Sequence, residues 1–182
     1  MDIFLVRHGE AAASWGEAPD PGLSALGRQQ AEEAATVLSS RIGQDTLLIS
    51  SPLQRALETA APLARELEQS VHTDAVFREI PSPVPLAQRQ AWLRQFMAQQ
   101  WEEQADDLLR WRQSALERLL ALQRPAVVFT HFLVINAVVG QLLQRPETLC
   151  FWPENGSITH LRHTGSSLEL VARGSEMATH VN

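Results

Sequence analysis

Short apolar runs alternate with longer amphipathic stretches along the chain. Three of the runs are short and mostly apolar, which predicts buried strands at residues 2–6, 46–50 and 126–130. Residues 157–163 and 167–173 predict two further short strands joined by Gly165, and residues 71–73 predict a short edge strand. The strands are separated by segments with helical spacing, apart from a loop rich in Gly, Pro and Ala over residues 11–22.

The first two helices have recognisable start signals. One begins at about Ser24, which can cap it, and buries one face through Ala31, Ala34, Ala35 and Leu38. The next covers residues 51–68, directly after a strand. Its start carries Ser51 as N-cap, Pro52 at the first helical position and Gln54 to complete a capping box. Pro62 is expected to kink this second helix or to divide it.

The second half of the chain predicts three more helices. Residues 80–85 contain three prolines and must be irregular, after which residues 85–101 read as a helix. Residues 103–123 form a long amphipathic helix, and residues 132–144 form a helix that is apolar nearly all round and therefore interior. The tail from Gly174 onward is expected to be weakly structured.

Strands that alternate with helices predict an α/β fold. We expect a three-layer α/β/α sandwich around a mostly parallel central sheet, formed by residues 1–182 as a single domain. In open sheets of this kind, ligands bind beyond the carboxyl ends of the strands. The residues that follow the predicted strands are therefore the first place to look for chemistry.

Composition narrows the class of protein. The formal net charge of −6 argues against a surface that binds nucleic acid or anionic membrane. The only cysteine is Cys150, so neither an intrachain disulfide nor a cysteine-based metal cluster is expected. The first residues lack the features of a signal peptide, and no apolar segment is long enough to span a bilayer. These observations predict a cytoplasmic protein, and they give no indication of its oligomeric state.

Ionisable residues gather at three strand ends. The first strand runs into Arg7, His8, Gly9 and Glu10, the second leads into a helix with Arg55 in its first turn, and the third runs into His131. Two imidazoles and two guanidinium groups can accept a tetrahedral dianion. A neutral imidazole can attack phosphorus, while the arginines neutralise charge on the oxygens. Gly9 would let backbone approach such a ligand closely.

Four segments in order resemble one family. They are RHGE after a buried strand, LSALGRQQA, SPLQRALETA and a later strand that ends in histidine. Together they resemble the histidine phosphatase superfamily, which has the phosphoglycerate mutase-like fold. The resemblance implies that His8 is the nucleophile that becomes phosphorylated and that Glu79 is the proton donor. It assigns Arg7, Arg55 and His131 to the rest of the phosphate pocket, with no metal and no cofactor.

Other residues match the family less closely. The segment 155–158 resembles a late family segment whose backbone, near Ser157, approaches the pocket, and we expect Ser157 to bind substrate. Ala11 and Ser14 replace the Thr and Asn that many relatives carry, although Ser14 can still donate to a phosphoryl oxygen. Phe132 follows the second histidine, where Gly is usual, and either narrows the pocket or changes the start of the helix.

Several roles stay open at this point. Glu79 is either the acid or a surface residue that pairs with Arg78 or Arg89, and Glu10 anchors the loop, orients His8 or is solvated. Residues 80–101 are expected to form a substrate-side cap. In that segment the side chains of Trp92, Phe96, Met97 and Trp101 either roof the site or pack in the core.

The first hypothesis for function is a metal-independent phosphomonoesterase that acts on a small phosphorylated metabolite. A mutase and a phosphohistidine phosphatase are narrower versions of it. A catalytically weak phosphate-binding regulatory module is the alternative from another class. A metallohydrolase that uses His8, His131 and a carboxylate ranks lowest, because two arginines beside the site would repel a divalent cation.

Overall fold

The structure is a computed structural model, and it describes residues 1–14 and 17–178. The described residues form a six-stranded sheet of order β3-β2-β4-β1-β5-β6. Its strands are β1 (Asp2–Arg7), β2 (Leu47–Ser50), β3 (Val71–Thr73), β4 (Ala126–Thr130), β5 (Ile158–His163) and β6 (Leu168–Ala172). The first four strands in this order run parallel to one another. Strand β5 pairs antiparallel with β1, and β6 pairs antiparallel with β5. The mostly parallel sheet and its edge strand β3 confirm the sequence prediction.

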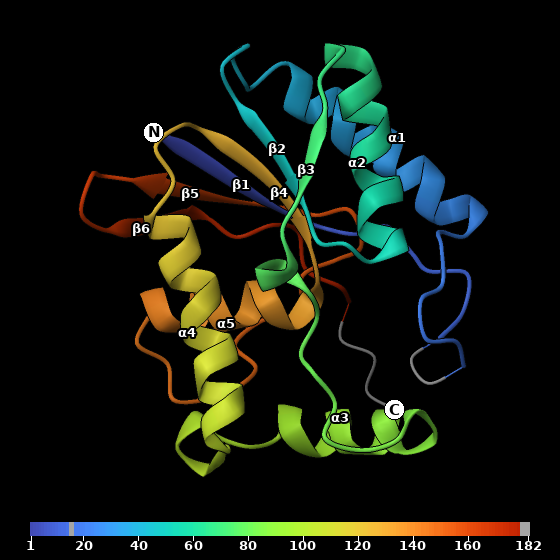
Figure 1. Cartoon of the computed structure of the whole chain (residues 1–182), viewed down its shortest axis with the longest axis vertical. Coiled ribbons are helices and arrows are strands. Elements are labelled where there is room, and N and C mark those ends of the chain that lie inside the picture. The colour runs from blue at the N-terminus through green and yellow to red at the C-terminus, as the bar shows by residue number, and fades with distance from the viewer. Residues whose placement is uncertain (15–16, 179–182) are drawn as a thin grey trace.

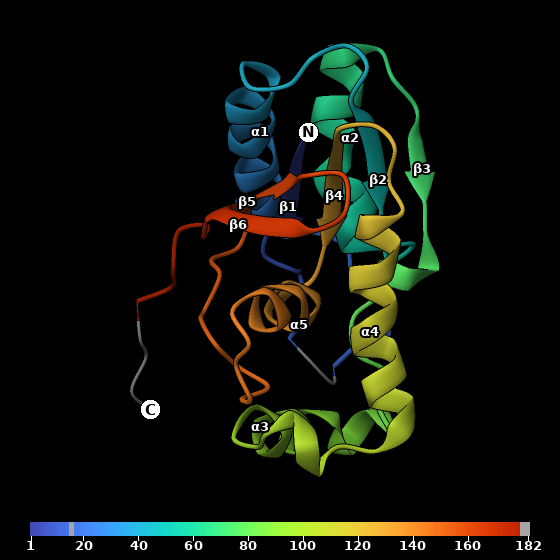
Figure 2. The ribbon, with the colours of Figure 1, turned by 90° about the vertical axis from the view of Figure 1, so that its left-hand side faces the viewer.

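Helices cover both faces of this sheet, as Figures 1 and 2 show. The helices are α1 (Ala25–Ser39), α2 (Gln54–Leu67), α3 (Arg89–Met97), α4 (Asp106–Leu120) and α5 (Phe132–Leu142). One core lies between the sheet and helices α1 and α2, where Phe4 and Val6 of β1 meet Leu38 and Leu63. The opposite face of β1 packs on α4 and α5. The three-layer sandwich is confirmed, and α3 lies apart from the sheet.

Helix α2 begins later than its sequence signals suggest. Leu53, not Ser51, is at the N-cap position, and it makes no capping bond through its side chain. Ser51 continues the sheet instead, because its backbone N–H donates to the Phe129 carbonyl at 2.9 Å. The predicted capping box is therefore wrong. Helix α2 also continues through the buried Pro62 without a break, so the expected division does not occur.

The expected helix over residues 85–101 is shorter in the structure. Only α3 is α-helical, and single 3₁₀ turns lie on either side at Leu86–Gln88 and Trp101–Glu103. The hydroxyl of Thr148 donates to the carbonyls of Phe96 and Gln99 at 2.6 and 3.0 Å, which satisfies acceptors at the end of this helix. Residues 80–85 are irregular, as predicted.

The aromatic residues of this segment belong to a third core. Phe96 and Trp101 are buried in a cluster with Leu93, Leu108 and Phe132, and Trp92 and Met97 pack against it. The alternative in which these side chains roof the site is therefore wrong for this structure. They fix α3 to the starts of α4 and α5.

The final segment is more ordered than expected up to residue 178. Glu176 forms a bridge with Pro153, and the Met177 N–H donates to the Trp152 carbonyl at 2.8 Å. Residues 174–178 form no helix or strand, which agrees with the prediction of a weakly structured tail, but their backbone also pairs with the loop before β5. Residues 179–182 lie outside the described residues. Among the described helices, none combines the length and apolar character that crossing a membrane requires.

Candidate active site

The sheet register brings the two histidines together. Arg7 pairs with Thr130 at the ends of the parallel strands β1 and β4, and the His8 N–H donates to the Thr130 carbonyl at 3.0 Å. His8 and His131 therefore leave the same edge of the sheet side by side. Their ring centroids are 5.2 Å apart. Both rings are buried, so the sheet edge carries a pair of imidazoles that water hardly reaches.

The hydrogen bonds of His8 define its tautomer. The Nδ1 atom lies 2.7 Å from the Gly9 carbonyl, which can only accept, so Nδ1 carries the proton. The Arg55 Nε–H donates to Nε2 at 3.1 Å, so Nε2 carries a lone pair. Burial, and then the charges of Arg55 and Arg7, hold the pKa of His8 well below its ordinary value. The ring is therefore neutral, and Nε2 is its nucleophilic nitrogen.

Arg7 is held from several sides, yet one of its donors is unused. Its Nη1 donates to the Pro153 carbonyl at 2.8 Å and contacts the Met177 sulfur at 3.3 Å. The guanidinium lies 5.0 Å from the centre of the Phe132 ring, in a cation–π arrangement. Its Nε is buried and has no hydrogen-bond partner. Burial lowers the pKa of Arg7 to about 10, so the group stays charged at neutral pH.

His131 has a similar unused nitrogen. Its Nε2 lies 2.7 Å from the Ser51 hydroxyl, and its Nδ1 is buried without a partner. The Ser51 oxygen also accepts from the Leu53 N–H at 3.3 Å. When the Ser51 hydroxyl donates to Nε2, the imidazole proton of His131 lies on Nδ1. Burial and the neighbouring His8 keep the pKa of His131 well below its ordinary value. Arg7 Nε and His131 Nδ1 are thus two buried nitrogens without hydrogen-bond partners beside His8, and when both carry a proton they suit the oxygens of an anion.

Glu79 lies in a buried position next to this group. Its carboxylate accepts from the backbone N–H groups of Ile80 at 3.0 Å and Leu133 at 3.3 Å. Burial nevertheless raises the pKa of Glu79, although Arg55 and Arg89 oppose the rise. The sequence-based alternative of a solvated surface pair is wrong, because Glu79 is buried and forms no ion pair among the described residues.

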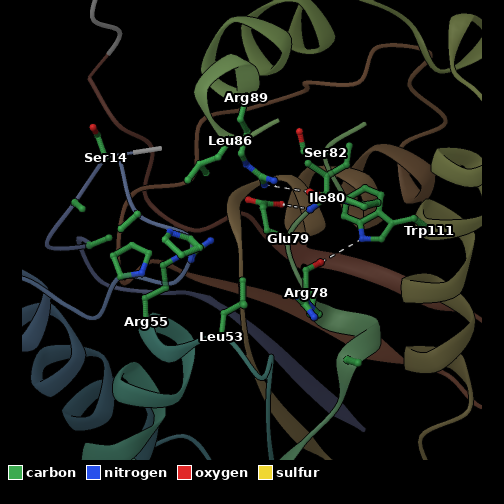
Figure 3. Close-up of a pocket in the computed structure, with 17 residues that line it drawn as sticks. Ser14, Leu53, Arg55, Arg78, Glu79, Ile80, Ser82, Leu86, Arg89 and Trp111 are labelled. Carbon is green, nitrogen blue, oxygen red and sulfur yellow. Dashed lines mark hydrogen bonds between the residues drawn. The ribbon is translucent and has the colours of Figure 1, made fainter. Parts of the chain in front are cut away.

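Two hollows meet at these residues. Arg55 and Glu79 line a cleft of about 600 Å³, whose lining residues Figure 3 shows in close-up. His8 and Arg7 line a second hollow of about 360 Å³. Both hollows share Ser14 and the alanines before it, and the bond between Arg55 and His8 links them. The candidate site therefore opens on both sides of the loop at residues 11–14.

The loop after His8 is fixed by a close approach of two glycines. A Cβ on Gly9 would lie 2.3 Å from the Gly27 carbonyl oxygen in α1. This packing against Gly27 alone requires glycine at position 9, and the close approach of its backbone to a ligand stays a prediction. Glu10 anchors the loop, because it accepts from the Ser24 hydroxyl at 2.8 Å and its N–H donates to Gln30 at 2.8 Å. These two hydrogen bonds favour the anchoring role of Glu10 over the alternatives in which it orients His8 or is only solvated.

The two predicted serines are placed differently. Ser14 is exposed and lines both hollows. The backbone near Ser157 does approach the site, as expected, because the Arg7 N–H donates to the Ser157 carbonyl at 3.0 Å. The buried Ser157 side chain borders another hollow beside α1, so the structure does not bring it to His8. Asn155 is there instead, and its amide donates to the His8 carbonyl at 3.2 Å. The 155–158 motif contained this signal, because the amide of Asn155 carries two N–H donors where a hydroxyl carries one.

The remaining lining residues were not predicted as binding residues. Leu86, Arg89 and Trp111 line the cleft, and they come from the segment 80–101 and from α4. Phe132 is buried at the start of α5 between Arg7 and Trp152, so it shapes the wall behind Arg7. Among the described residues, no group of three or more His, Cys, Asp or Glu side chains is arranged to hold a metal ion.

Comparison with known proteins gives a consistent set of relatives. A family model described as histidine phosphatase superfamily (branch 1) matches residues 3–175. A glucosyl-3-phosphoglycerate phosphatase from Mycolicibacterium vanbaalenii is 41% identical over 81 residues, which are 42% of this chain and 35% of that protein. The chain thus spans between about a fifth and little more than a third of the length of the curated relatives that it matches.

Solved structures match over nearly their whole length. A mycobacterial glucosyl-3-phosphoglycerate phosphatase with inorganic phosphate has a TM-score of 0.73 at 27% identity, covering 96% of this chain and 97% of that one. A phosphoserine phosphatase from Entamoeba histolytica with 3-phosphoglyceric acid has a TM-score of 0.76 at 24% identity, covering 97% and 98%. The second match supports the fold alone.

Proposed function

The chain belongs to the histidine phosphatase superfamily, branch 1, and from this premise we propose that it is a metal-independent phosphomonoester hydrolase. It acts through a phosphohistidine intermediate on a small phosphorylated metabolite, within one domain whose substrate side is the segment 80–101. The observation that carries this proposal is the state of His8, whose unprotonated Nε2 faces Arg55. The named relatives, which are phosphatases of phosphorylated metabolites, support the substrate class.

In the first step, His8 attacks the phosphoryl group. The substrate replaces the present bond between Arg55 and Nε2, and Arg55 then donates to the phosphoryl oxygens. The unused donors on Arg7 Nε and His131 Nδ1 take the other oxygens. A bond forms between Nε2 and phosphorus while the bond from phosphorus to the leaving oxygen breaks. The Gly9 carbonyl holds the Nδ1 proton, which stabilises the positive charge that develops on the ring.

Glu79 completes the reaction as acid and base. Burial raises its pKa and so favours the protonated form, and in the proposed cycle Glu79 gives its proton to the leaving oxygen. The resulting carboxylate then takes a proton from the water that attacks phosphorus. That attack breaks the bond to Nε2, releases inorganic phosphate and restores neutral His8 and protonated Glu79.

Turnover of p-nitrophenyl phosphate tests this proposal. The wild-type protein should hydrolyse it, and His8→Ala should remove that activity, because the variant lacks the Nε2 that attacks phosphorus in the proposed reaction. During turnover of a ³²P-labelled phosphate ester, the wild-type protein should accumulate an acid-labile ³²P label. His8→Ala should not accumulate it. Tight binding of phosphate without any turnover would instead identify a regulatory phosphate-binding module.

Excess chelator tests the metal-dependent alternative. The rate with p-nitrophenyl phosphate should be unchanged after dialysis against EDTA, since Arg7 and Arg55 supply the positive charge that a metal would otherwise bring. A loss of rate that Mg²⁺ or Zn²⁺ restores would contradict the metal-independent mechanism.

A further inference from the structure

The cleft beyond Glu79 carries more positive charge than one phosphoryl group explains. Three arginines line it, Arg55, Arg78 and Arg89, and Glu79 is the only acidic residue among the described residues that line it. The chain as a whole has a net charge of −6, so this excess of positive charge is local. In the proposed reaction Glu79 is protonated when substrate binds. The charge of Asp20 then still acts on Arg55, whereas Arg89 has no ion-paired carboxylate among the described residues.

Arg89 lies on the cap side of the cleft. Figure 3 shows the Glu79 side chain between Arg55, on the sheet side, and Arg89, and both arginines act on the Glu79 carboxylate. Arg89 Nη2 donates to the Ile80 carbonyl at 3.1 Å, which holds the guanidinium over the cleft. A guanidinium has five N–H donors, so most of them stay available. No carboxylate among the described residues pairs with Arg89.

The position of Arg89 in its helix is also unfavourable without a ligand. Arg89 is the first residue of α3, where the helix dipole disfavours a cation. The side chain is partly buried, which lowers the screening of its charge by water. A cation at such a position, with free donors and no acidic partner, is suited to an anion that arrives with the substrate.

We propose that Arg89 binds a second anionic group of the substrate, a carboxylate or a second phosphate, on the leaving group. The inference rests on the proposed function, which places the transferred phosphoryl group at His8 and the leaving oxygen at Glu79. The leaving group then extends past Glu79 toward α3, where Arg89 forms paired hydrogen bonds with the second anion. The substrate class is thus a phosphomonoester with at least two anionic groups.

Inhibition of p-nitrophenyl phosphate hydrolysis by simple phosphate esters tests this inference. Two matched pairs serve as inhibitors, 3-phosphoglycerate against glycerol 3-phosphate and fructose 1,6-bisphosphate against fructose 6-phosphate. Each pair differs by one anionic group, a carboxylate in the first and a phosphate in the second. The wild type should bind the more highly charged member of at least one pair about tenfold more tightly.

The variants assign that preference to Arg89. Arg89→Gln should abolish the preference and leave the inhibition constants of glycerol 3-phosphate and fructose 6-phosphate within about twofold of wild type. Arg94→Gln is the matched control, because Arg94 is an exposed arginine of the same helix that does not line the cleft. Arg89→Lys, which keeps the charge and loses the fork, should retain part of the preference.

The outcomes separate this inference from the proposed function. Absence of p-nitrophenyl phosphate turnover in the wild type rejects the proposed function itself. Turnover with no preference in either pair, or with a preference that survives Arg89→Gln, rejects only the Arg89 site. Should Arg89→Gln fail to fold, the comparison of the pairs in the wild type and in Arg89→Lys still decides the matter.

Discussion

At the scale of single residues, the surroundings of Glu79 determine its chemistry. Two backbone N–H groups favour the carboxylate, yet burial outweighs them and raises the pKa. A protonated carboxyl group next to the phosphoryl site is useful mainly when the leaving group is a poor one. The importance of Glu79 should therefore depend on the leaving group, which gives a direct test.

Glu79→Gln should reduce kcat/KM for an alkyl phosphate by about 10²- to 10⁴-fold. It should reduce kcat/KM for p-nitrophenyl phosphate far less, since p-nitrophenolate leaves without protonation. Steady-state kinetics on both substrates measure the difference. Equal losses on the two would show that Glu79 is not the acid.

The pH profile of the same variant gives the control. Because the pKa of Glu79 is raised and that of His8 is lowered, kcat/KM for the alkyl phosphate should rise as His8 loses its proton at acidic pH. It should fall again as pH increases through the pKa of Glu79. Glu79→Gln should remove the falling limb alone.

Ser51 is a positioning residue, because it acts through His131. Ser51→Ala should lower kcat/KM by about tenfold or more, since the buried Nε2 loses its partner and the proton on Nδ1 is no longer specified. Ser51→Thr, which keeps the hydroxyl, should restore most of the rate. Ser50→Ala is the matched control, because Ser50 is equally buried and its hydroxyl donates to the Ser51 carbonyl. Equal losses for Ser50→Ala and Ser51→Ala would contradict the role.

At the scale of secondary structure, alternation of strands and helices was enough to predict the sheet and its reactive edge. His8 and His131 each follow a buried strand, and the parallel pairing of β1 and β4 does the rest. The helix start at residue 51 could not be predicted correctly, because local capping signals compete with a backbone bond to Phe129 that forms only in the folded sheet. The helical spacing of the aromatic residues also could not show whether Phe96 and Trp101 roof the site or pack in a core, as they do in the structure.

The placement of Asn155 and Arg89 was beyond the sequence for a related reason. Asn155 and Arg89 each reach the site from a segment whose position depends on contacts with residues distant in the sequence. The Asn155 amide meets His8 only after β5 has paired with β1, and Arg89 faces the cleft only once α3 is fixed by the third core. Residues near the strand ends could therefore be predicted, whereas those on the substrate side could not.

The contact between the catalytic loop and α1 predicts an unusual result for Gly27→Ala. Alanine normally stabilises a helix relative to glycine. At Gly27 the new Cβ would lie 2.1 Å from the Glu10 carbonyl oxygen, so α1 or the loop after His8 must move. We expect a loss of about 1 to 3 kcal/mol in the free energy of unfolding, together with reduced activity. Urea denaturation and the rate with p-nitrophenyl phosphate measure the two effects.

Gly140→Ala is the control for this substitution. Gly140 lies in α5, and the nearest atom to its new Cβ is the Cys150 sulfur at 3.9 Å, an ordinary contact. It should be neutral or stabilising by about 0.5 to 1 kcal/mol. A similar gain in stability for Gly27→Ala would show that the close approach to Glu10 does not constrain the loop.

At the scale of the whole molecule, the proposed phosphoryl site is a positive region in an acidic protein. The site contains the buried guanidinium groups of Arg7 and Arg55, and the buried Arg7 Nε and His131 Nδ1 have no hydrogen-bond partners. Segments that are far apart in the sequence hold these groups together. Assembling these charges costs free energy in the absence of an anion, because the guanidinium groups are desolvated and lie close together. An anion that fills the site should therefore stabilise the entire fold.

Inorganic phosphate should raise the melting temperature accordingly. At a concentration of about one hundred times its dissociation constant, binding adds about 2.7 kcal/mol to the unfolding free energy. For a chain of this length, that corresponds to an increase of about 5 to 10 °C, measured by scanning calorimetry. Sodium chloride at the same ionic strength should give little shift, because it lacks the tetrahedral oxygens that the donors of Arg7 and His131 require. Arg55→Gln should lose most of the increase and Arg94→Gln should keep it, so an equal increase in both would mean that phosphate binds elsewhere.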